Sequence, residues 1–353
     1  MFKQLDRYIA RNVLSAMLVV QLLILGLDFI ITYINDLSDV EGDYGAFQVL
    51  IYLLIRLPYR FYEYAPVGVL LGALLGLGAM ASSNELTIMR AAGWSLVRII
   101  WGVMKPLGLV ILVTMATGEL VAPHTEQFAA SWRDQLQQGR GHVVTEDGGW
   151  QREGNSYYNF GSIQGDSTLI NVNRYRFDGN RLVEATHADR ATYHSGSWQL
   201  QDVSRTRFSD KGTVVNHEAQ ADWDTELKPA LLKLIINKKE SQSMVDLWRY
   251  GRYLNDQGLQ ASTTWLYFWQ KLLQPAMLAG LVLVAASFIF GPLRTVAAGT
   301  RVFYGIITGL VFKYLQDLLA PASTIFGFSP IWAVLLPTAL CFIIGLLMLR
   351  RTG

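Results

Sequence analysis

The sequence is poor in cysteine and in charged side chains. Because it has a single cysteine, Cys341, no disulfide can form within the chain, and this cysteine lies inside an apolar run. Only 16% of the 353 residues are charged and 51% are hydrophobic, whereas a soluble domain of this size carries about a quarter charged residues. This composition predicts a membrane protein. The formal net charge of +2 distinguishes no class of partner.

Signatures of catalysis are also missing. No G-x-x-x-x-G-K-[ST] phosphate loop occurs, so the sequence offers no such cradle for a nucleotide. The five histidines all fall in the polar middle of the chain, which argues against a membrane-embedded enzyme acting on lipids: His124, His142, His187, His194 and His217. We therefore expect no metal site, no cofactor bound by this chain and no enzymatic activity of its own. Any ATP and Mg²⁺ would be used by a separate subunit.

Six apolar runs are long enough to cross a bilayer, which takes about 20 helical residues. They are about Val13–Ile34, Phe47–Ala81, Val97–Val121, Thr264–Phe290, Val302–Leu319 and Ile331–Leu349. The first run is longer than the apolar core of a signal peptide and no A-x-A site follows it, so we expect it to be a membrane helix.

Residues 125–240 have a different character. Short alternating segments such as TLINVNRYRF and SWQLQDVSRTRF are separated by Gly- and Asn-containing turns, a pattern typical of antiparallel strands in a sandwich or jelly roll. Ser243 then opens a helix that Gly258 can end. The expected fold is six transmembrane helices with an inserted all-β, jellyroll-like domain: residues 1–124 hold three helices and a coupling helix at about 83–92, residues 125–258 the β-domain, and residues 259–353 three more helices.

Basic residues set the expected orientation. Those that flank the spans fall on one side: Lys3, Arg7, Arg11, Arg90, Arg98, Arg294, Arg301, Arg350 and Arg351. The opposite short loops, Asn35–Tyr44 and Ala320–Pro330, contain no Lys or Arg. The positive-inside rule therefore predicts that both termini are cytoplasmic and that the β-domain lies outside.

The segment Ala81–Ser95 is a polar interruption between two spans. Asn84, Glu85 and Arg90 give it charge and polarity, and Leu86 and Met89 recur at helical spacing to give an apolar stripe. A short helix of this kind suits a groove on a partner protein. An ordinary solvated turn remains the alternative on spacing alone.

Glycines recur four apart in the second span. Gly68, Gly72 and Gly76 fall on one helix face and would let another helix approach closely. This pattern predicts helix packing, whether fixed or moving.

Charged residues near the spans are candidate substrate contacts. Arg56, Arg60 and Arg133 would lie near the outer leaflet, where they could meet anionic headgroups or a phosphorylated ligand, or simply snorkel to the interface. Lys313 and Asp317 are four apart, so a local ion pair and a role in a polar cavity are both open. Phe29 and Phe312 are further candidates for lipid contact in the predicted spans, completing the substrate-binding set.

Four segments resemble a known family over essentially the whole length of the chain. They are LDRYIARN at Leu5–Asn12, LLGALLGLGAMASSNELTIMRAAG at Leu70–Gly93, GELVAPHTEQ at Gly118–Gln127 and SFIFGPLR at Ser287–Arg294. The chain resembles the LptF/LptG permease family of lipopolysaccharide export. The resemblance implies a permease subunit of an ABC transporter in the bacterial inner membrane, which extracts lipopolysaccharide and passes it to a periplasmic bridge.

The same resemblance implies partners and roles. In that family LptF and LptG pair on two copies of the ATPase LptB, and the transmembrane helix of LptC packs against the pair. Carried over, the coupling helix is about Ser83–Ala92, with Glu85 facing LptB. Arg133 falls where the family has a basic residue near the glycolipid's polar head, and Lys313 lies on a cavity-lining span. The first, second and fifth spans would line the lipid cavity, and the β-jellyroll would be periplasmic. A membrane receptor or scaffold whose β-domain senses an envelope ligand is the alternative function.

Overall fold

The computed structural model describes residues 2–40, 42–138, 142–144, 150–164, 168–194, 196–209, 212–223, 225, 239–291 and 296–352. Arg294 and residues 226–238, which were assigned above to a basic loop and to the β-region, lie outside this part. The chain divides into two compact units. The helical unit comprises Met1–Ser38, Leu53–Thr125 and Ser262–Gly353, and the sheet unit comprises Asp39–Tyr52 and Glu126–Ala261.

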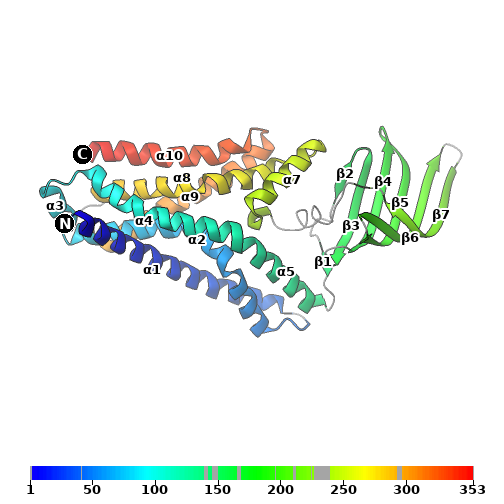
Figure 1. The fold of residues 1–353 in the computed structure, drawn as a ribbon, viewed down its shortest axis with the longest axis horizontal. Helices are drawn as coiled ribbons and strands as arrows, with labels where there is room; N and C mark the ends of the chain where they lie inside the picture. The colour runs from blue at the N-terminus through cyan, green and yellow to red at the C-terminus, as the bar shows by residue number, and fades with distance from the viewer. Residues whose placement is uncertain are drawn as a thin grey trace. The chain divides into compact units, whose positions relative to one another are not determined.

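The helical unit is a bundle of long helices (Figure 1). They are α1 (Phe2–Asp36), α2 (Ala46–Ser82), α4 (Leu96–Ala116), α8 (Ser262–Phe290), α9 (Ala298–Ile325) and α10 (Pro330–Thr352), with the short helix α3 (Glu85–Ala91) between α2 and α4. A π-helical turn, η2 (Thr117–Val121), joins α4 to α5 (Ala122–Gln138). Each of the six predicted apolar runs is therefore helical.

Five helical stretches in the described part are long and apolar enough to cross a membrane: Gln4–Asp39, Ala46–Ser82, Leu96–Gln137, Ser262–Phe290 and Pro330–Arg351. Helix α9, the sixth expected span, is not among them, although its 28 residues have the length. It carries Lys313, Gln316 and Asp317 within its sequence, which lowers its mean hydropathy. The fold class is confirmed as mostly helical with an inserted sheet, and α9 is the span that composition supports least.

The core of the helical unit joins side chains from most of its helices. Ile9 of α1, Leu74 of α2, Ile99 of α4 and Leu278 of α8 are all fully buried in one cluster. Between apolar helices in a bilayer, association depends on close packing and not on removal of apolar surface from water. The tight core is therefore what holds these helices together.

The sheet unit contains one antiparallel sheet in the order β1-β3-β4-β5-β6-β7, and β2 also pairs with β3. The strands are β1 (His142–Val144), β2 (Gln151–Glu153), β3 (Ser156–Gln164), β4 (Thr168–Asp178), β5 (Arg181–His194), β6 (Ser197–Ser209) and β7 (Gly212–Trp223). The unit also holds η3 (Lys239–Ser241) and α7 (Met244–Asp256), whose N-cap is Ser243 as expected, and η1 (Leu37–Asp39) spans the division between the two units in the chain. The jellyroll is not confirmed, because a jelly roll needs Greek-key crossovers between two sheets and β3 to β7, as described, neighbour one another in chain order.

The sheet bends along a row of residues that breaks the alternation of the strands. Asn171 and Asp202 have φ of 59° and 53°, in the left-handed region. Leu200 and Val203 lie three apart on β6 yet are both buried in the same cluster, as are Leu169 and Val172 on β4. The register of neighbouring strands is kept through this row, so the break is a bend that the strands share and not a bulge. The curvature brings Tyr158 of β3 to a ring-centroid distance of 5.1 Å from Trp223 of β7. A period-two reading of the sequence cannot show this bend.

Candidate functional site

Helix α3 is a short polar segment held at both ends by special backbone conformations. Asn84 precedes it with φ 61°, and Gly93 follows it with φ 86°. The Gly93 N–H donates to the Arg90 carbonyl at 3.0 Å and the Trp94 N–H donates to the Met89 carbonyl at 3.1 Å, which closes the last turn. The seven residues of α3 are thus fixed between α2 and α4.

Glu85 contacts the first helix of its own chain. The Tyr8 hydroxyl of α1 donates to Glu85 Oε1 at 3.0 Å. The second carboxylate oxygen, Oε2, is buried without a hydrogen-bond partner. A buried acceptor without a donor costs stability. The carboxylate therefore links α3 to α1 as well as lying at the start of the exposed helix.

The structure corrects the predicted apolar stripe of α3. Leu86 and Met89 are only 4% and 6% exposed and pack into the core of the helical unit. They are therefore not surfaces offered to a partner. The large apolar side chain that α3 does expose is Ile88, at 65%, with Arg90 and Asn84 also exposed. The spacing identified the helix but assigned its outward face to the wrong residues.

The glycines of α2 pack directly against α1. A Cβ atom at Gly72 would clash with the backbone of Met17, and one at Gly76 would lie 2.9 Å from the Cα atom of Val13. At Gly68 it would clash with the side chain of Gln21, whose Nε2 donates to the Phe61 carbonyl of α2 at 3.1 Å. The two helices thus meet backbone to backbone along this face.

Gly72→Leu is expected to destabilise the helical unit by at least roughly 1–3 kcal/mol, because the neighbouring atoms are backbone and cannot move aside by a rotamer change. The measurement is thermal unfolding of the purified chain in detergent. Gly108→Leu is the matched control, since a Cβ at Gly108 on α4 meets nothing within 4 Å. Equal stability of the two variants would contradict the close approach of α1 and α2.

Arg60 belongs to an ion-pair cluster between α1 and α2. Its Nη1 lies 2.9 Å from Glu63 Oε2 and its Nε lies 3.6 Å from Asp28 Oδ2. The Tyr64 hydroxyl donates to Asp28 Oδ1 at 2.7 Å. Arg56 is half-buried one helical turn before Arg60. Arg60 is thus held by carboxylates of its own chain, so a ligand at this position would share the arginine with Asp28 and Glu63.

Arg133 lies in the sheet unit and is held in a similar way. Its Nη2 is 2.8 Å from Asp39 Oδ2, and the guanidinium lies over the rings of Tyr44 and Tyr52 at 5.4 and 5.3 Å. Cation–π contacts of this kind hold a guanidinium in place. The side chain is 23% exposed, so its outer edge remains open to solvent. These contacts give Arg133 a structural role. A ligand could contact only the exposed part of its guanidinium group.

The remaining predicted contacts are separated in the structure. Lys313 Nζ lies 3.3 Å from Asp317 Oδ2, with side chains 63% and 54% exposed, so the ion pair of the two alternatives is present. Phe312 is 8% exposed and belongs to the core cluster, which corrects its expected place on an open lipid path. Phe29 is half-buried on α1. These residues do not converge on one site in the described structure.

Lys271 is a buried charged residue that was not among the candidates predicted from the sequence. It is 4% exposed within α8, and its Nζ donates to the Gly118 carbonyl at 2.9 Å. It also lies 4.0 Å from Glu119 Oε2 and 5.2 Å from the centre of the Tyr62 ring. Gly118 is in the π-turn η2, where the regular helical bonding is interrupted. A lysine inside an apolar run was the available signal.

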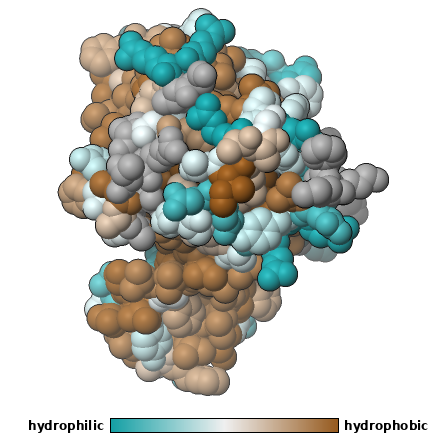
Figure 2. Space-filling model, turned by 90° about the vertical axis from the view of Figure 1, so that its left-hand side faces the viewer, coloured by the Kyte–Doolittle hydropathy of each residue, from teal (hydrophilic) through white to brown (hydrophobic). Residues whose placement is uncertain are grey.

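Large apolar side chains cover two helices on the outside of the helical unit. On α1 they include Leu18, Leu22, Leu23, Leu27, Ile30 and Ile34, and on α9 Phe303, Leu310, Val311, Tyr314 and Leu318, all between 46% and 63% exposed except Leu318 at 69%. Figure 2, which faces the end that holds α3, shows hydrophobic residues in brown over much of the surface, with hydrophilic residues in teal gathered elsewhere. Apolar surface on this scale is covered by lipid or by another protein.

A bundle of helices that are long and apolar enough to cross a membrane, with a sheet unit inserted between α5 and α8, defines a multi-pass membrane protein. Among the described residues no group of three or more His, Cys, Asp or Glu side chains could hold a metal ion.

Comparison with known proteins gives the family. The family described as lipopolysaccharide export system permease LptF/LptG matches residues 7–351. The chain belongs to this family, and its role is that of a permease in lipopolysaccharide transport. It is 33% identical over 355 residues to the permease protein LptG of Escherichia coli K12 and 31% identical to LptG of Haemophilus influenzae, with 99% of each chain covered. It is 23% identical to LptF of Escherichia coli K12 over 273 residues, 69% of this chain and 72% of that one. The resemblance read from the four sequence segments is confirmed.

Proposed function

We propose that the chain is the membrane subunit of an ABC transporter that extracts lipopolysaccharide from the bacterial inner membrane and passes it to a periplasmic bridge. An LptF-type permease is its partner in a heterodimer, two copies of an LptB-type ATPase hydrolyse ATP with Mg²⁺, and an LptC-type helix packs against the pair. The chain itself binds no cofactor. Similarity to both LptG and LptF supports the pairing, because two related permeases are distinguished within one family.

The exposed face of α3 carries the proposal for the ATPase. The sequence has no phosphate loop, so energy has to enter through a contact with another subunit. Backbone hydrogen bonds close the last turn of helix α3, which presents Ile88 and Arg90 to solvent, while Leu86 and Met89 anchor it in the core. A helix fixed in this way transmits movement of a bound partner to α2 and α4. Glu85 passes the same movement to α1 through Tyr8.

The distribution of basic residues supports the orientation. Arg90, Arg350 and Arg351 fall on the side of the helices that the positive-inside rule assigns to the cytoplasm. Both termini and α3 are then cytoplasmic and the sheet unit is periplasmic.

The exposed apolar faces of α1 and α9 support a lipid path. Lipopolysaccharide has many acyl chains, and each buried methylene is worth about 0.8 kcal/mol against water. An apolar path from bilayer to protein avoids that cost. The exposed parts of Arg56, Arg60 and Arg133 suit its phosphates, and Phe29 and Lys313 complete the set of proposed contacts.

Co-purification tests this assignment. A tagged chain extracted in mild detergent is expected to carry a second six-span permease and an ATPase, and the purified chain alone is expected to hydrolyse no ATP. The readout is mass spectrometry of the eluted complex, with an unrelated tagged membrane protein as control. Recovery of the chain without either partner, from cells that still export lipopolysaccharide, would contradict the proposal.

A further inference from the structure

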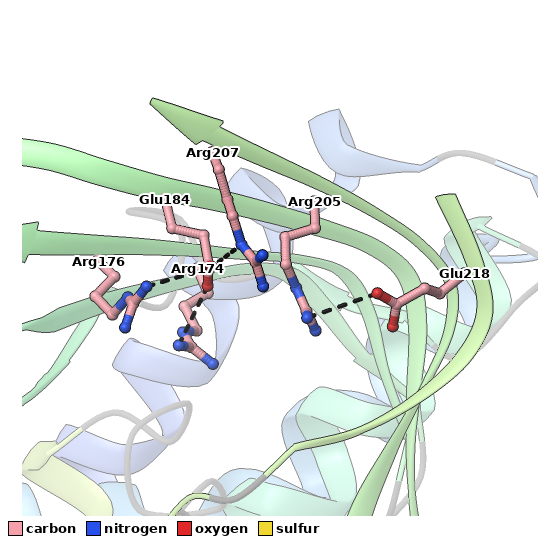
Figure 3. Close-up of polar contacts among 6 residues, drawn as sticks. All are labelled: Arg174, Arg176, Glu184, Arg205, Arg207 and Glu218. Carbon is pink, nitrogen blue, oxygen red and sulfur yellow. Dashed lines mark hydrogen bonds and ion pairs between the residues drawn. The ribbon is translucent and has the colours of Figure 1, made fainter. Parts of the chain in front are cut away.

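Three arginines contact one buried carboxylate on the sheet, and a fourth contacts a second carboxylate beside it (Figure 3). Glu184 of β5 has a side chain only 7% exposed, and its Oε2 lies 3.3 Å from Arg176 Nη2 and 3.2 Å from Arg207 Nε. Its Oε1 lies 3.5 Å from Arg174 Nη2. Arg205 contacts a second carboxylate, with 3.6 Å between its Nη1 and Glu218 Oε1. We call Arg174, Arg176, Arg205 and Arg207 the arginine cluster.

The register places the arginine cluster on the face that also holds the core of the sheet. Arg176, Glu184 and Arg207 form one row across β4, β5 and β6, and Arg174, Thr186 and Arg205 form the next row. Side chains two apart on a strand share a face. The row after these is Val172, Ala188 and Val203, which are all buried in the core. The cluster is therefore a polar continuation of the apolar inner face.

The arginine cluster has more positive charge than its own carboxylates neutralise. Four guanidinium groups contact two carboxylates, Glu184 and Glu218. A third carboxylate, Glu153 of β2, lies in the same row as Arg176 with Ser156 between them, so at least one positive charge is in excess. A buried glutamate needs a partner, yet one or two arginines would satisfy it. The excess points to a ligand with negative charge.

Unpartnered polar atoms lie inside the cluster. Thr186 is 5% exposed, and its Oγ1 is buried without a hydrogen-bond partner among the described residues, as are the Nε atoms of Arg174 and Arg205 on either side of it. Such atoms are rare in folded proteins because each costs stability. In contrast to these buried atoms, the side chains of Arg176 and Arg207 are 47% and 58% exposed, so N–H donors of both guanidinium groups are accessible to a ligand.

We propose that the arginine cluster binds a phosphoryl group on the inner face of the sheet, with Glu184 positioning the guanidinium groups. A phosphate monoester carries a charge of about −1.5 to −2 at pH 7, opposite in sign to the excess. Arginine forks suit phosphate oxygens through paired hydrogen bonds. The group belongs to a phosphorylated glycolipid or is free phosphate. The lipid source rests on the permease role, whereas free phosphate does not.

Photocrosslinking from β7 tests the lipid source. Val214 pairs with Arg207 and Val215 with Thr206, so these two valines lie on opposite faces with similar exposure, 58% and 53%. The full-length chain, with p-benzoylphenylalanine at one position or the other, is placed in proteoliposomes with lipopolysaccharide or its dephosphorylated form. Crosslinking is expected from position 214, not from 215, and only with the phosphorylated lipid. The yield is expected to fall about tenfold or more in Arg176→Gln/Arg207→Gln and to persist in Arg190→Gln, an exposed arginine elsewhere on β5.

Inorganic phosphate tests the other source. Thermal unfolding of the full-length chain is measured in phosphate and in chloride at equal ionic strength. Stabilisation that phosphate gives to the wild type and to Arg190→Gln, but not to Arg176→Gln/Arg207→Gln, supports a site for free phosphate. Absence of both the crosslink and the stabilisation overturns the proposal, as does an equal loss in Arg190→Gln. Co-purification of the transport partners is unaffected by either result, so failure of this site and failure of the permease assignment are distinguishable.

Discussion

Lys271→Met is expected to lower the free energy of unfolding of the helical unit by about 3 kcal/mol. The substitution keeps the length of the side chain and removes its charge and its donors. Without the ammonium group, the Gly118 carbonyl loses its 2.9 Å hydrogen bond and Glu119 loses a cation 4.0 Å away. Breaking a buried charged contact by removing one partner costs about 3–5 kcal/mol in soluble proteins. A hydrogen bond between membrane helices contributes only about 1–2 kcal/mol, so the expected loss is set at the lower end of the first range. Denaturation in mixed micelles gives the value.

Lys313→Met is the matched control for this prediction. Lys313 also lies on a long helix and also faces a carboxylate, but both side chains are more than half exposed. Exposed pairs contribute about 0–1 kcal/mol, so this variant is expected to unfold close to the wild type. A double-mutant cycle that combines Lys271→Met with Glu119→Gln measures how much of the lost stability comes from the interaction between Lys271 and Glu119. If Lys271→Met and Lys313→Met lose the same stability, the π-turn does not depend on Lys271.

Ile88→Asp is expected to reduce recovery of the ATPase with the tagged chain by about tenfold or more, since a central apolar contact in an interface contributes about 2 kcal/mol or more. Ile88 is 65% exposed, so the change leaves the chain's own core intact. The measurement is the ratio of ATPase to permease in the eluate, together with ATP hydrolysis by the recovered complex.

Two further variants separate the partner contact from internal packing. Ile88→Leu keeps an apolar side chain and is expected to retain the ATPase. Glu85→Lys removes the hydrogen bond from Tyr8 as well as the charge, so it tests α3 and its link to α1 together. Normal recovery of the ATPase with Ile88→Asp would show that the exposed face of α3 is not the contact.

Hydrophobic periodicity and length predicted the helices well, because a bilayer demands long apolar runs whose backbone bonds are satisfied within the helix. The glycine spacing on α2 identified the face that contacts α1, because only glycine permits backbones to meet. The same reasoning placed Leu86 and Met89 on a stripe but could not say what the stripe faces. Burial of a short amphipathic helix depends on the neighbours that the fold brings to it.

Alternation predicted strands but not their arrangement. The left-handed residues Asn171 and Asp202 shift the core positions, and the resulting bend brings β3 and β7 into contact. No period-two pattern contains that information. The described strands β3 to β7 form a meander, and the expected jelly roll stays a prediction.

The sequence by itself determined that this is a membrane protein of six apolar runs with an inserted sheet, that it has no phosphate loop, and which family it belongs to. Composition, run length and motifs are local properties, so they can be read along the chain. The tertiary structure alone decided that Lys271 meets the π-turn 153 residues before it and that three arginines from two strands surround Glu184. Those contacts join residues far apart in the chain, and they form only when helix packing and strand register bring the side chains together.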